Sequence, residues 1–152
     1  MCQINPNKII EMKILIPAEG TKVQQNGIDL TLLEDLTLSP TRRFENVALQ
    51  EFVNIPDRMI GIIFARSSMN RVGLQITSGL WDSGFVGRIG CSMAYLGNDI
   101  ITIPKKTRVA QIVFISGDNH SMYNGFYSNQ NTMESKFQHS GGIGVEIDKR
   151  IA

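Results

Sequence analysis

Short apolar runs separated by turn signals are the feature that most limits how this chain can fold. Val, Ile, Phe and Thr dominate these runs, while apolar residues at helical spacing are scarce. The runs are KILIP (13–17), GIDLTLLEDLTL (27–38), MIGIIFA (59–65), GLQITS (73–78), FVGRIGCSMAYL (85–96), DIITIP (99–104) and TRVAQIVFI (107–115). Turn-forming residues separate them, at PAEG, NIPD, DSG, GND and IPKK. This pattern predicts an all-β barrel or jelly-roll sandwich.

One short helix is predicted within ARSSMNRVG (65–73), where Ser67 or Ser68 can cap the first turn and Gly73 can end the last. The N-terminus of this helix would carry Arg66 and two hydroxyl groups. Unpaired N–H groups at such an end attract anions, and a neighbouring guanidinium adds to the attraction. The segment is therefore either an anion site or an ordinary capped turn.

Length and charge exclude several classes of protein. A chain of 152 residues suits one domain, and no apolar run approaches the ~20 residues that span a bilayer. The first residues are too polar for a signal peptide, and two cysteines form no disulfide framework. We therefore expect a cytoplasmic protein, in the host cytoplasm if the gene is viral. The formal net charge of +1 gives no basic stripe, so we expect neither nucleic acid nor membrane as a partner, whereas a small anion needs only a few cationic side chains.

The composition changes after residue 116. Residues 117–152 are polar and rich in glycine, with sparse aromatic side chains. We therefore divide the chain into a β domain, residues 1–116, and a C-terminal extension of the same domain, residues 117–152. The extension is either plain surface or a mobile segment that closes over a ligand, where aromatic faces can stack on a flat ring.

Four stretches are weak signals separately but specific in this order and spacing. They are Gly27-Ile28-Asp29-Leu30, Ala65-Arg66-Ser67-Ser68, GLWDSGFVG (79–87) and Arg108-Val109-Ala110-Gln111-Ile112. With them the chain resembles the trimeric dUTPase and dCTP deaminase superfamily, from about Gly27 to about Gly142. The resemblance implies a β-clip or distorted jelly-roll subunit, and a homotrimer whose active sites are shared between chains.

The stretch TSGLWDSGFVGRIG (77–90) surrounds a single carboxylate, Asp82, with aromatic residues and glycines. By the resemblance, Asp82 is a general base that activates water for attack on the α-phosphorus of dUTP, giving dUMP and pyrophosphate. Mg²⁺, held by the triphosphate and water without a direct protein ligand, would stabilise the phosphate charge together with basic side chains. The alternative for Asp82 is a turn aspartate that bonds local backbone N–H groups.

The resemblance also assigns residues to the nucleotide. Those expected to bind it are Arg66, Ser67, Ser68, Arg71, Gly79, Phe85, Ile89, Gln111, Lys136 and Phe137. Phe85 would stack against the deoxyribose, where dUTPases usually have tyrosine, and the strand 88–92 would present its backbone to the base. Lys136 would bind the γ-phosphate, and Phe137 would cover the base.

Four further residues leave alternatives open. Asp29 either supports the site floor or a metal-bound water shell, or is a strand-edge aspartate with a local hydrogen bond. Arg108 is either a sheet-edge cation or a site residue. Gln111 is an amide among apolar neighbours, so it needs hydrogen-bond partners, which the site could supply. Trp81 is better explained as a core or interface aromatic than as a ligand contact.

One position separates the two branches of the superfamily. Deaminases carry a glutamate five residues after the closing glycine of the hairpin, Gly87, and this chain has Ser92 there. A serine hydroxyl is far too weak an acid to shuttle protons to cytosine, so we expect hydrolysis, with uracil as the preferred base. The tail departs from the usual fifth dUTPase motif, which keeps two alternatives: a dCTP deaminase or other dCTP-acting or bifunctional member, and a non-catalytic nucleotide-binding homologue.

Overall fold

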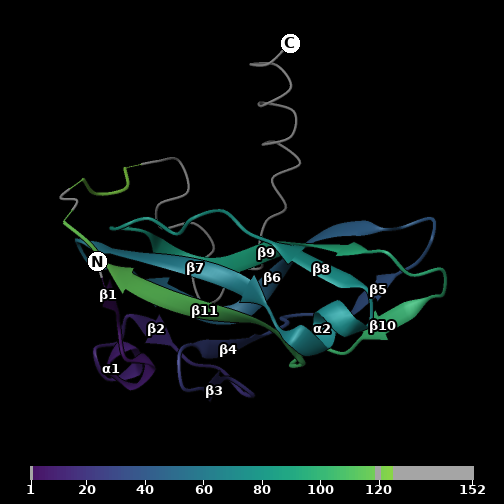
Figure 1. Ribbon diagram of the computed structural model, residues 1–152, viewed down its shortest axis with the longest axis horizontal. Coiled ribbons are helices and arrows are strands. Elements are labelled where there is room, and N and C mark those ends of the chain that lie inside the picture. Colours follow the sequence, from purple (N-terminus) through teal and green to yellow (C-terminus); the bar gives the residue numbers. More distant parts are fainter. Residues whose placement is uncertain (1, 119–120, 125–152) are drawn as a thin grey trace, which may run out of the picture.

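Two antiparallel sheets, assembled from strands that lie far apart in the sequence, make up most of the fold (Figure 1). The computed structural model describes residues 2–118 and 121–124. Its helices and strands are β1 (Cys2–Gln3), α1 (Pro6–Glu11), β2 (Leu15–Ile16), β3 (Lys22–Val23), β4 (Ile28–Thr31), β5 (Leu36–Leu38), β6 (Phe44–Asn54), β7 (Met59–Ala65), α2 (Ser67–Arg71), β8 (Leu74–Thr77), β9 (Val86–Tyr95), β10 (Ile101–Ile103) and β11 (Arg108–Ser116).

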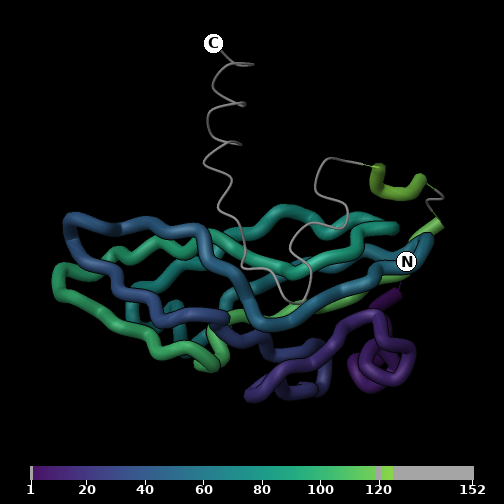
Figure 2. The backbone as a smooth tube through the Cα atoms, turned by 180° about the vertical axis from the view of Figure 1, so that it is seen from behind, coloured from purple at the N-terminus to yellow at the C-terminus, as the bar shows by residue number. Residues whose placement is uncertain are grey.

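The first sheet has β11 at its centre. β11 pairs with β7 along one edge and with β1 and β4 along the other, and β3 continues the sheet beyond β4. The second sheet has the order β2, β6, β9, β8, and β5 and β10 form a separate pair. Figures 1 and 2 show the N-terminal elements, from α1 to β4, along the lower side of the molecule. The arrangement confirms the all-β, jelly-roll-like fold expected from the sequence.

The core lies between the two sheets. Ile112 and Phe114 of β11 are buried in the same hydrophobic cluster as Ile89 and Met93 of β9. Full burial of each such side chain contributes about 1.5–3 kcal/mol. The cluster therefore fixes β9, which follows the Asp82 turn, against the sheet that carries Arg108.

The predicted runs and breaks agree with the observed strands. Each of the seven apolar runs contains at least one strand, and the turn signals fall at strand ends or between strands. The run 27–38 contains two strands, β4 and β5, because the chain bends at residues 33–34. The helix predicted within residues 65–73 is α2.

The prediction of a single helix was wrong, because α1 is a second one. Asn5 caps this helix by accepting a hydrogen bond from the N–H of Asn7 at 2.9 Å, and Pro6 occupies its first turn. The Asn-Pro pair was the available signal, but six helical residues give too little periodicity to stand out. Among the residues described, neither helix has the length or hydropathy needed to cross a bilayer.

Strand β6 is the longest strand described, and the sequence analysis missed it. Its core-facing positions alternate as Val47, Leu49, Glu51 and Val53, all of them buried. The charged Glu51 interrupts this apolar alternation, and with Gln50 beside it only the short apolar runs 47–49 and 52–53 remain. One buried carboxylate therefore concealed the alternation that marks this strand.

Candidate active site

Asp82 lies in residues 78–85, which connect β8 to β9. These two strands pair as an antiparallel hairpin, from Thr77 opposite Ser92 to Leu74 opposite Tyr95. The N–H of Phe85 donates to the carbonyl oxygen of Asp82 at 3.1 Å, which closes a four-residue turn. Gly84 has φ +84°, a left-handed conformation that type II turns require at this position and that favours glycine. The glycine predicted to shape this turn therefore has a backbone reason to be there.

The turn is anchored on the connection between β6 and β7. The buried hydroxyl of Ser83 donates to the carbonyl oxygen of Met59 at 2.7 Å and accepts from its N–H at 3.1 Å. Ile55 accepts from the N–H of Gly84 at 2.8 Å and donates to the carbonyl oxygen of Phe85 at 2.9 Å. These bonds fix the backbone around Asp82 while its side chain stays exposed.

The Asp82 carboxylate makes no hydrogen bond or ion pair with any side chain or backbone group within residues 2–118 and 121–124. The alternative role, a turn aspartate that satisfies local N–H groups, therefore finds no such bond in the described chain. A fixed, exposed and unengaged carboxylate can accept a proton from a bound water.

Three aromatic rings pack behind the turn. The Phe85 ring lies 4.8 Å from that of Trp81 and 5.8 Å from that of Tyr123, measured between centroids and in edge-on arrangements. Phe85 is only 6% exposed, so its ring has little surface to offer a sugar in this arrangement. Trp81 packs against the core and its indole N–H donates to the hydroxyl of Ser78 at 3.1 Å, in agreement with a core role.

The N-terminal half of β9 has an open edge beside the turn. The pairing of β8 with β9 ends at Thr77 and Ser92, and the described chain places no strand beside residues 86–91 on that side. The side chain of Ile89 is fully buried, so only its backbone can face a ligand. Gly79 is exposed, with nothing within 4 Å of the place a Cβ would take.

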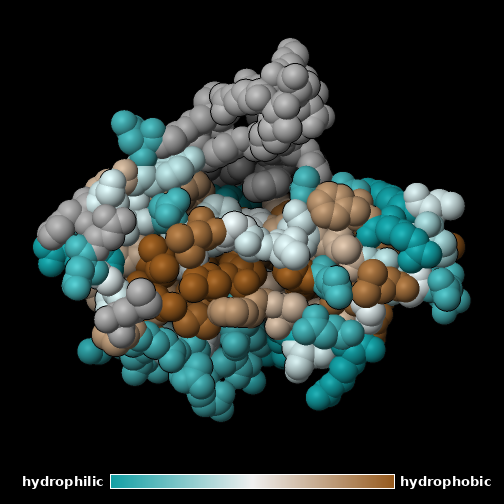
Figure 3. All heavy atoms as spheres, turned by 45° about the horizontal axis from the view of Figure 1, so that its top comes forward, coloured by the Kyte–Doolittle hydropathy of each residue, from teal (hydrophilic) through white to brown (hydrophobic). Residues whose placement is uncertain are grey.

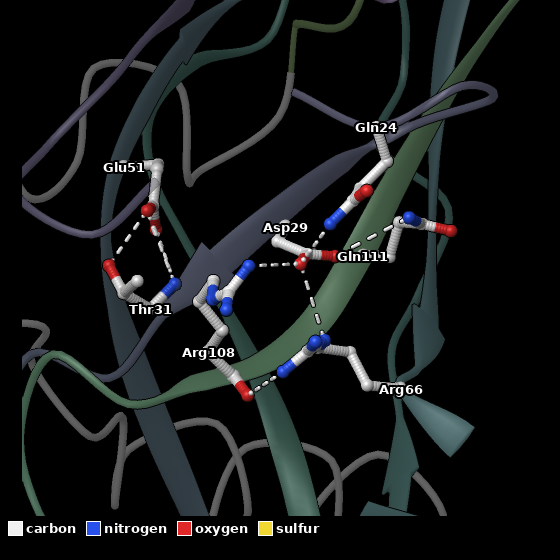
Figure 4. Close-up of polar contacts among 7 residues, drawn as sticks. All are labelled: Gln24, Asp29, Thr31, Glu51, Arg66, Arg108 and Gln111. Atoms are coloured by element: carbon white, nitrogen blue, oxygen red, sulfur yellow. Dashed lines mark hydrogen bonds and ion pairs between the residues drawn. The ribbon is translucent and has the colours of Figure 1, made fainter. Parts of the chain in front are cut away.

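A second cluster surrounds the buried carboxylate of Asp29 on β4 (Figure 4). Its Oδ2 atom lies 3.3 Å from Nε of Arg66 and 3.2 Å from Nη1 of Arg108. The same oxygen accepts from Gln24 at 2.8 Å, and Oδ1 lies at 3.4 Å from the amide nitrogen of Gln111. With its oxygens engaged by protein donors, Asp29 fits the site floor better than a metal-bound water shell.

The two arginines are held beside each other with an excess of positive charge. Arg66 also donates to the carbonyl oxygen of Arg108 at 3.0 Å, which adds a second constraint on its guanidinium. The side chains of Arg66 and Arg108 are 27% and 34% exposed, so part of each faces solvent. Two partly exposed cations oriented by one buried anion can bind anionic oxygens, such as those of a phosphate.

Hydroxyls and a third cation border this cluster. Ser67 and Ser68 begin α2 directly after Arg66, and both are exposed. Arg71 is exposed at the last residue of the same helix and makes no side-chain hydrogen bond or ion pair with a described residue. The residues predicted to bind phosphate therefore lie next to one another, whereas Lys136 and Phe137 lie outside the described residues.

Sequence reasoning missed Gln24, and it left the role of Arg108 undecided. Gln24 lies in the short loop between β3 and β4, where nothing in the sequence marks it. Arg108 could have been found from register, because Arg108 pairs with Thr31 and Gln111 with Asp29 across β11 and β4. The repeat of polar residues on one face of two adjacent strands was the available signal.

Strand β6, which pairs with β9, carries the buried carboxylate of Glu51. Both carboxylate oxygens of Glu51 accept from the N–H of Thr31 at 3.1 Å, and its Oε1 accepts from the hydroxyls of Thr31 and Thr21. Burial raises the pKa of the Glu51 carboxyl, and these hydrogen bonds act against the rise. Arg88 donates to the carbonyl oxygen of Gln50 at 2.7 Å, which ties β9 to the bulge in β6 opposite Ile89.

Two negative findings limit what the site contains. In the described ranges, no three His, Cys, Asp or Glu side chains come together in a way that could hold a metal ion. A cavity of about 180 Å³ lies between residues 32–36 and 45–48, and it contains none of the predicted site residues. Its volume is below the several hundred Å³ usual for ligand sites, so it does not fit a nucleoside triphosphate.

Comparison with known proteins gives the relatives of this chain. The dUTPase family model matches residues 14–141. A probable deoxyuridine 5'-triphosphate nucleotidohydrolase of Halobacterium salinarum is 35% identical over 82 residues, which cover 54% of this chain and 48% of the relative. A dCTP deaminase of Pyrobaculum islandicum is 27% identical over 96 residues, covering 63% and 54%. The chain thus spans about half the length of these relatives.

A solved structure gives the same fold. A dUTPase variant from phage phi11 of S. aureus, whose structure coordinates a structural Mg(II) ion, superposes with a TM-score of 0.58 at 17% sequence identity, covering 73% of this chain and 95% of the phage protein. At this identity the likeness carries the fold alone. Because the family model matches most of the chain, and Asp29, Arg66, Asp82 and Gln111 all lie within the match, the chain belongs to the dUTPase family.

Proposed function

We propose that this protein is a dUTP diphosphatase, which hydrolyses dUTP to dUMP and pyrophosphate. The observation that carries the proposal is the Asp82 carboxylate, which is exposed on a fixed turn. Four hydrogen bonds fix the turn, two with the backbone of Ile55 and two between the hydroxyl of Ser83 and the backbone of Met59. The Halobacterium relative is named for the same activity, which supports the choice.

Asp82 would act as the general base. It accepts a proton from a water molecule, whose oxygen forms a bond to the α-phosphorus as the bond from that phosphorus to the α,β-bridging oxygen breaks. The bridging oxygen leaves with pyrophosphate, and the attacking oxygen remains in dUMP. General-base catalysis of this kind contributes about 10²–10⁴-fold to the rate.

Arg66 and Arg108 would bind the triphosphate, because Asp29 orients both guanidiniums and leaves them partly exposed. The hydroxyls of Ser67 and Ser68 and the exposed Arg71 can add further donors next to this pair. A Mg²⁺ ion would arrive on the triphosphate with its waters. Bound there, Mg²⁺ supplies charge neutralisation on the phosphate oxygens.

The open edge of β9 would recognise the base. Backbone N–H and C=O groups along residues 86–91 lack a neighbouring strand on the side of the turn, so they can pair with the polar edge of a pyrimidine. Uracil remains the proposed base, and its donor and acceptor pattern differs from that of cytosine at one edge.

We also propose that the active site forms between copies in a homotrimer. No hydrogen bond or ion pair in the described chain joins the Asp82 side chain to the Asp29 cluster. Apart from Gln111, the side chains of β7 and β11 on the face of Ile62 and Val113 are apolar, and Figure 3 shows hydrophobic residues gathered over these strands. They are Ile60, Ile62, Phe64, Val113 and Ile115.

This apolar face borders the arginine cluster. Phe64, which is 53% exposed, lies opposite Gln111 in the strand register, and Gln111 contacts Asp29. A second copy packed on this face would therefore come next to the Asp29 cluster and could bring its own Asp82 turn to the phosphates. Apolar faces of this kind are typical of protein interfaces.

Deamination is the second candidate, since dCTP deaminases are among the relatives. Two observations argue against it. The position of the deaminase glutamate holds Ser92, which has no carboxylate. Its hydroxyl donates to the side-chain oxygen of Asn46 on β6. The nearby Glu51 is fully buried and bonded to threonines, which keeps it away from any ligand at the open edge.

The test follows pyrophosphate and ammonia together after the purified protein is mixed with Mg²⁺ and either dUTP or dCTP. We expect pyrophosphate from dUTP without ammonia, and in ¹⁸O-labelled water the label should enter dUMP. Label in pyrophosphate would refute attack at the α-phosphorus. Ammonia from dCTP would establish the deaminase alternative, and silence with both nucleotides would favour a non-catalytic nucleotide-binding protein.

A further inference from the structure

Phe85, the ring that the sequence assigns to the sugar, offers little exposed surface at the Asp82 turn. Phe85 is 6% exposed because Trp81 and Tyr123 pack against its ring. Trp81 is fixed toward β7, since its backbone exchanges two hydrogen bonds with Gly61 at 2.8 and 3.0 Å. Tyr123, the second ring in contact with Phe85, is half exposed. It belongs to the segment that follows β11 in the chain.

Residues 121–124 are seated directly on the Asp82 turn. The N–H of Tyr123 donates to the carbonyl oxygen of Ser83 at 2.6 Å. A Cβ at Gly84 would lie 3.0 Å from the Cε atom of Met122 and 3.1 Å from the backbone nitrogen of Tyr123, so glycine at this position lets the segment approach. Ser121, Met122 and Asn124 are exposed while Tyr123 is half buried, which makes Tyr123 the anchor.

We propose that Tyr123 is a further substrate-binding residue, whose ring contacts the nucleotide held beside Asp82, with Phe85 as its buried support. The proposal rests on the proposed function, because it assumes a nucleotide at the turn. A phenol ring can stack against a sugar or base, and its hydroxyl can donate or accept a hydrogen bond at the rim. Phe85 offers neither an exposed face nor a hydroxyl.

The experiment compares the wild type with Tyr123→Ala and Tyr123→Phe, and with Met122→Ala as the matched control. Met122 is 51% exposed and belongs to the same segment. The backbone bond to Ser83 survives in all three variants, so only side chains are tested. Two readouts are used: kcat and KM with dUTP, and the dissociation constant of dUTP without Mg²⁺ from the fluorescence of Trp81, the single tryptophan of the chain.

Loss of aromatic stacking predicts that Tyr123→Ala raises KM and the dissociation constant about tenfold, equal to about 1.4 kcal/mol, and leaves kcat within about twofold. Tyr123→Phe should restore most of the affinity, and Met122→Ala should match the wild type. A role in bracing the turn would lower kcat instead, and a role as a cover over Phe85 would tighten binding; either result overturns the proposal.

The two readouts separate this inference from the proposed function. A wild type that hydrolyses dUTP while Tyr123→Ala keeps its affinity overturns the role of Tyr123 alone. A wild type that binds dUTP through Tyr123 without hydrolysing it overturns the diphosphatase activity alone. A wild type that neither binds nor hydrolyses dUTP overturns both.

Discussion

Replacing Asp29 with asparagine tests how the arginine pair is held. Asn has nearly the same shape but no charge, so Arg66 and Arg108 would lose the one carboxylate that both contact. A hydrogen bond to a charged group contributes about 1.5–3 kcal/mol, and partial exposure of both guanidiniums reduces this by roughly half. The hydrogen bond from Arg108 and the ion pair with Arg66 together therefore predict a loss of about 2 kcal/mol in the free energy of unfolding.

The loss is measured by urea unfolding, followed by the fluorescence of Trp81. All variants are compared at one protomer concentration, since assembly would make stability concentration-dependent. For a chain of this length, about 2 kcal/mol corresponds to a decrease of about 4–8 °C in Tm. The control is Asp99→Asn, an exposed position in the loop after β9, which should change stability by less than about 0.5 kcal/mol.

The same variant should also weaken binding of dUTP. With the carboxylate gone, the guanidiniums repel each other and lose the orientation that suits phosphate, so KM should rise at least tenfold while Asp99→Asn leaves it unchanged. Asp29→Asn with wild-type Tm and wild-type KM would refute the role given to Asp29 as the floor of the site.

Three further predictions concern the rest of the fold. Because burial raises the pKa of Glu51, its contribution to stability is fully present below the ordinary glutamate pKa and is lost as pH rises through the raised pKa of the folded state. The wild type should therefore gain stability over Glu51→Gln in urea unfolding as the pH falls from neutral toward the ordinary glutamate pKa, and equal pH dependence of the two proteins would contradict this. Gly27→Ala should cost about 1–3 kcal/mol, because the new Cβ would lie 2.7 Å from the carbonyl oxygen of Ile112 and 2.8 Å from Cγ of Gln111, and an unchanged urea midpoint would disprove it. Phe64→Asp should dissociate the proposed trimer in light scattering, whereas a variant that keeps the wild-type mass would show that the β7–β11 face is not the interface.

Alternation of apolar residues predicted most of the fold, and failed where a functional or structural carboxylate faces the core. β7 was predicted with its observed bounds because every residue in Met59–Ala65 is apolar. β6 was missed because Glu51 occupies a core position, which only its bonds to Thr21 and Thr31 make tolerable. The alternation of apolar and polar residues alone does not reveal a buried charged side chain whose hydrogen bonds are satisfied.

The candidate site was predicted in parts. Its residue types and order indicated Arg66, Asp82 and Gln111, and the structure brings Arg66 and Gln111 onto one carboxylate. The burial of Phe85 was not predictable, because it depends on Tyr123, which arrives from a segment 38 positions later in the chain. Contacts between such distant segments follow from the packing of the whole domain and leave no local signal.

The most direct test of the central claim is the turnover of Asp82→Asn with dUTP and Mg²⁺, beside Asp99→Asn. Asparagine keeps the size of the side chain but cannot accept the proton from water, so kcat should fall at least about 100-fold while KM changes less than about threefold. Tm should stay at the wild-type value, since the Asp82 side chain is exposed and bonded to no described residue. A variant that retains kcat within about threefold would contradict the role of Asp82 as the base.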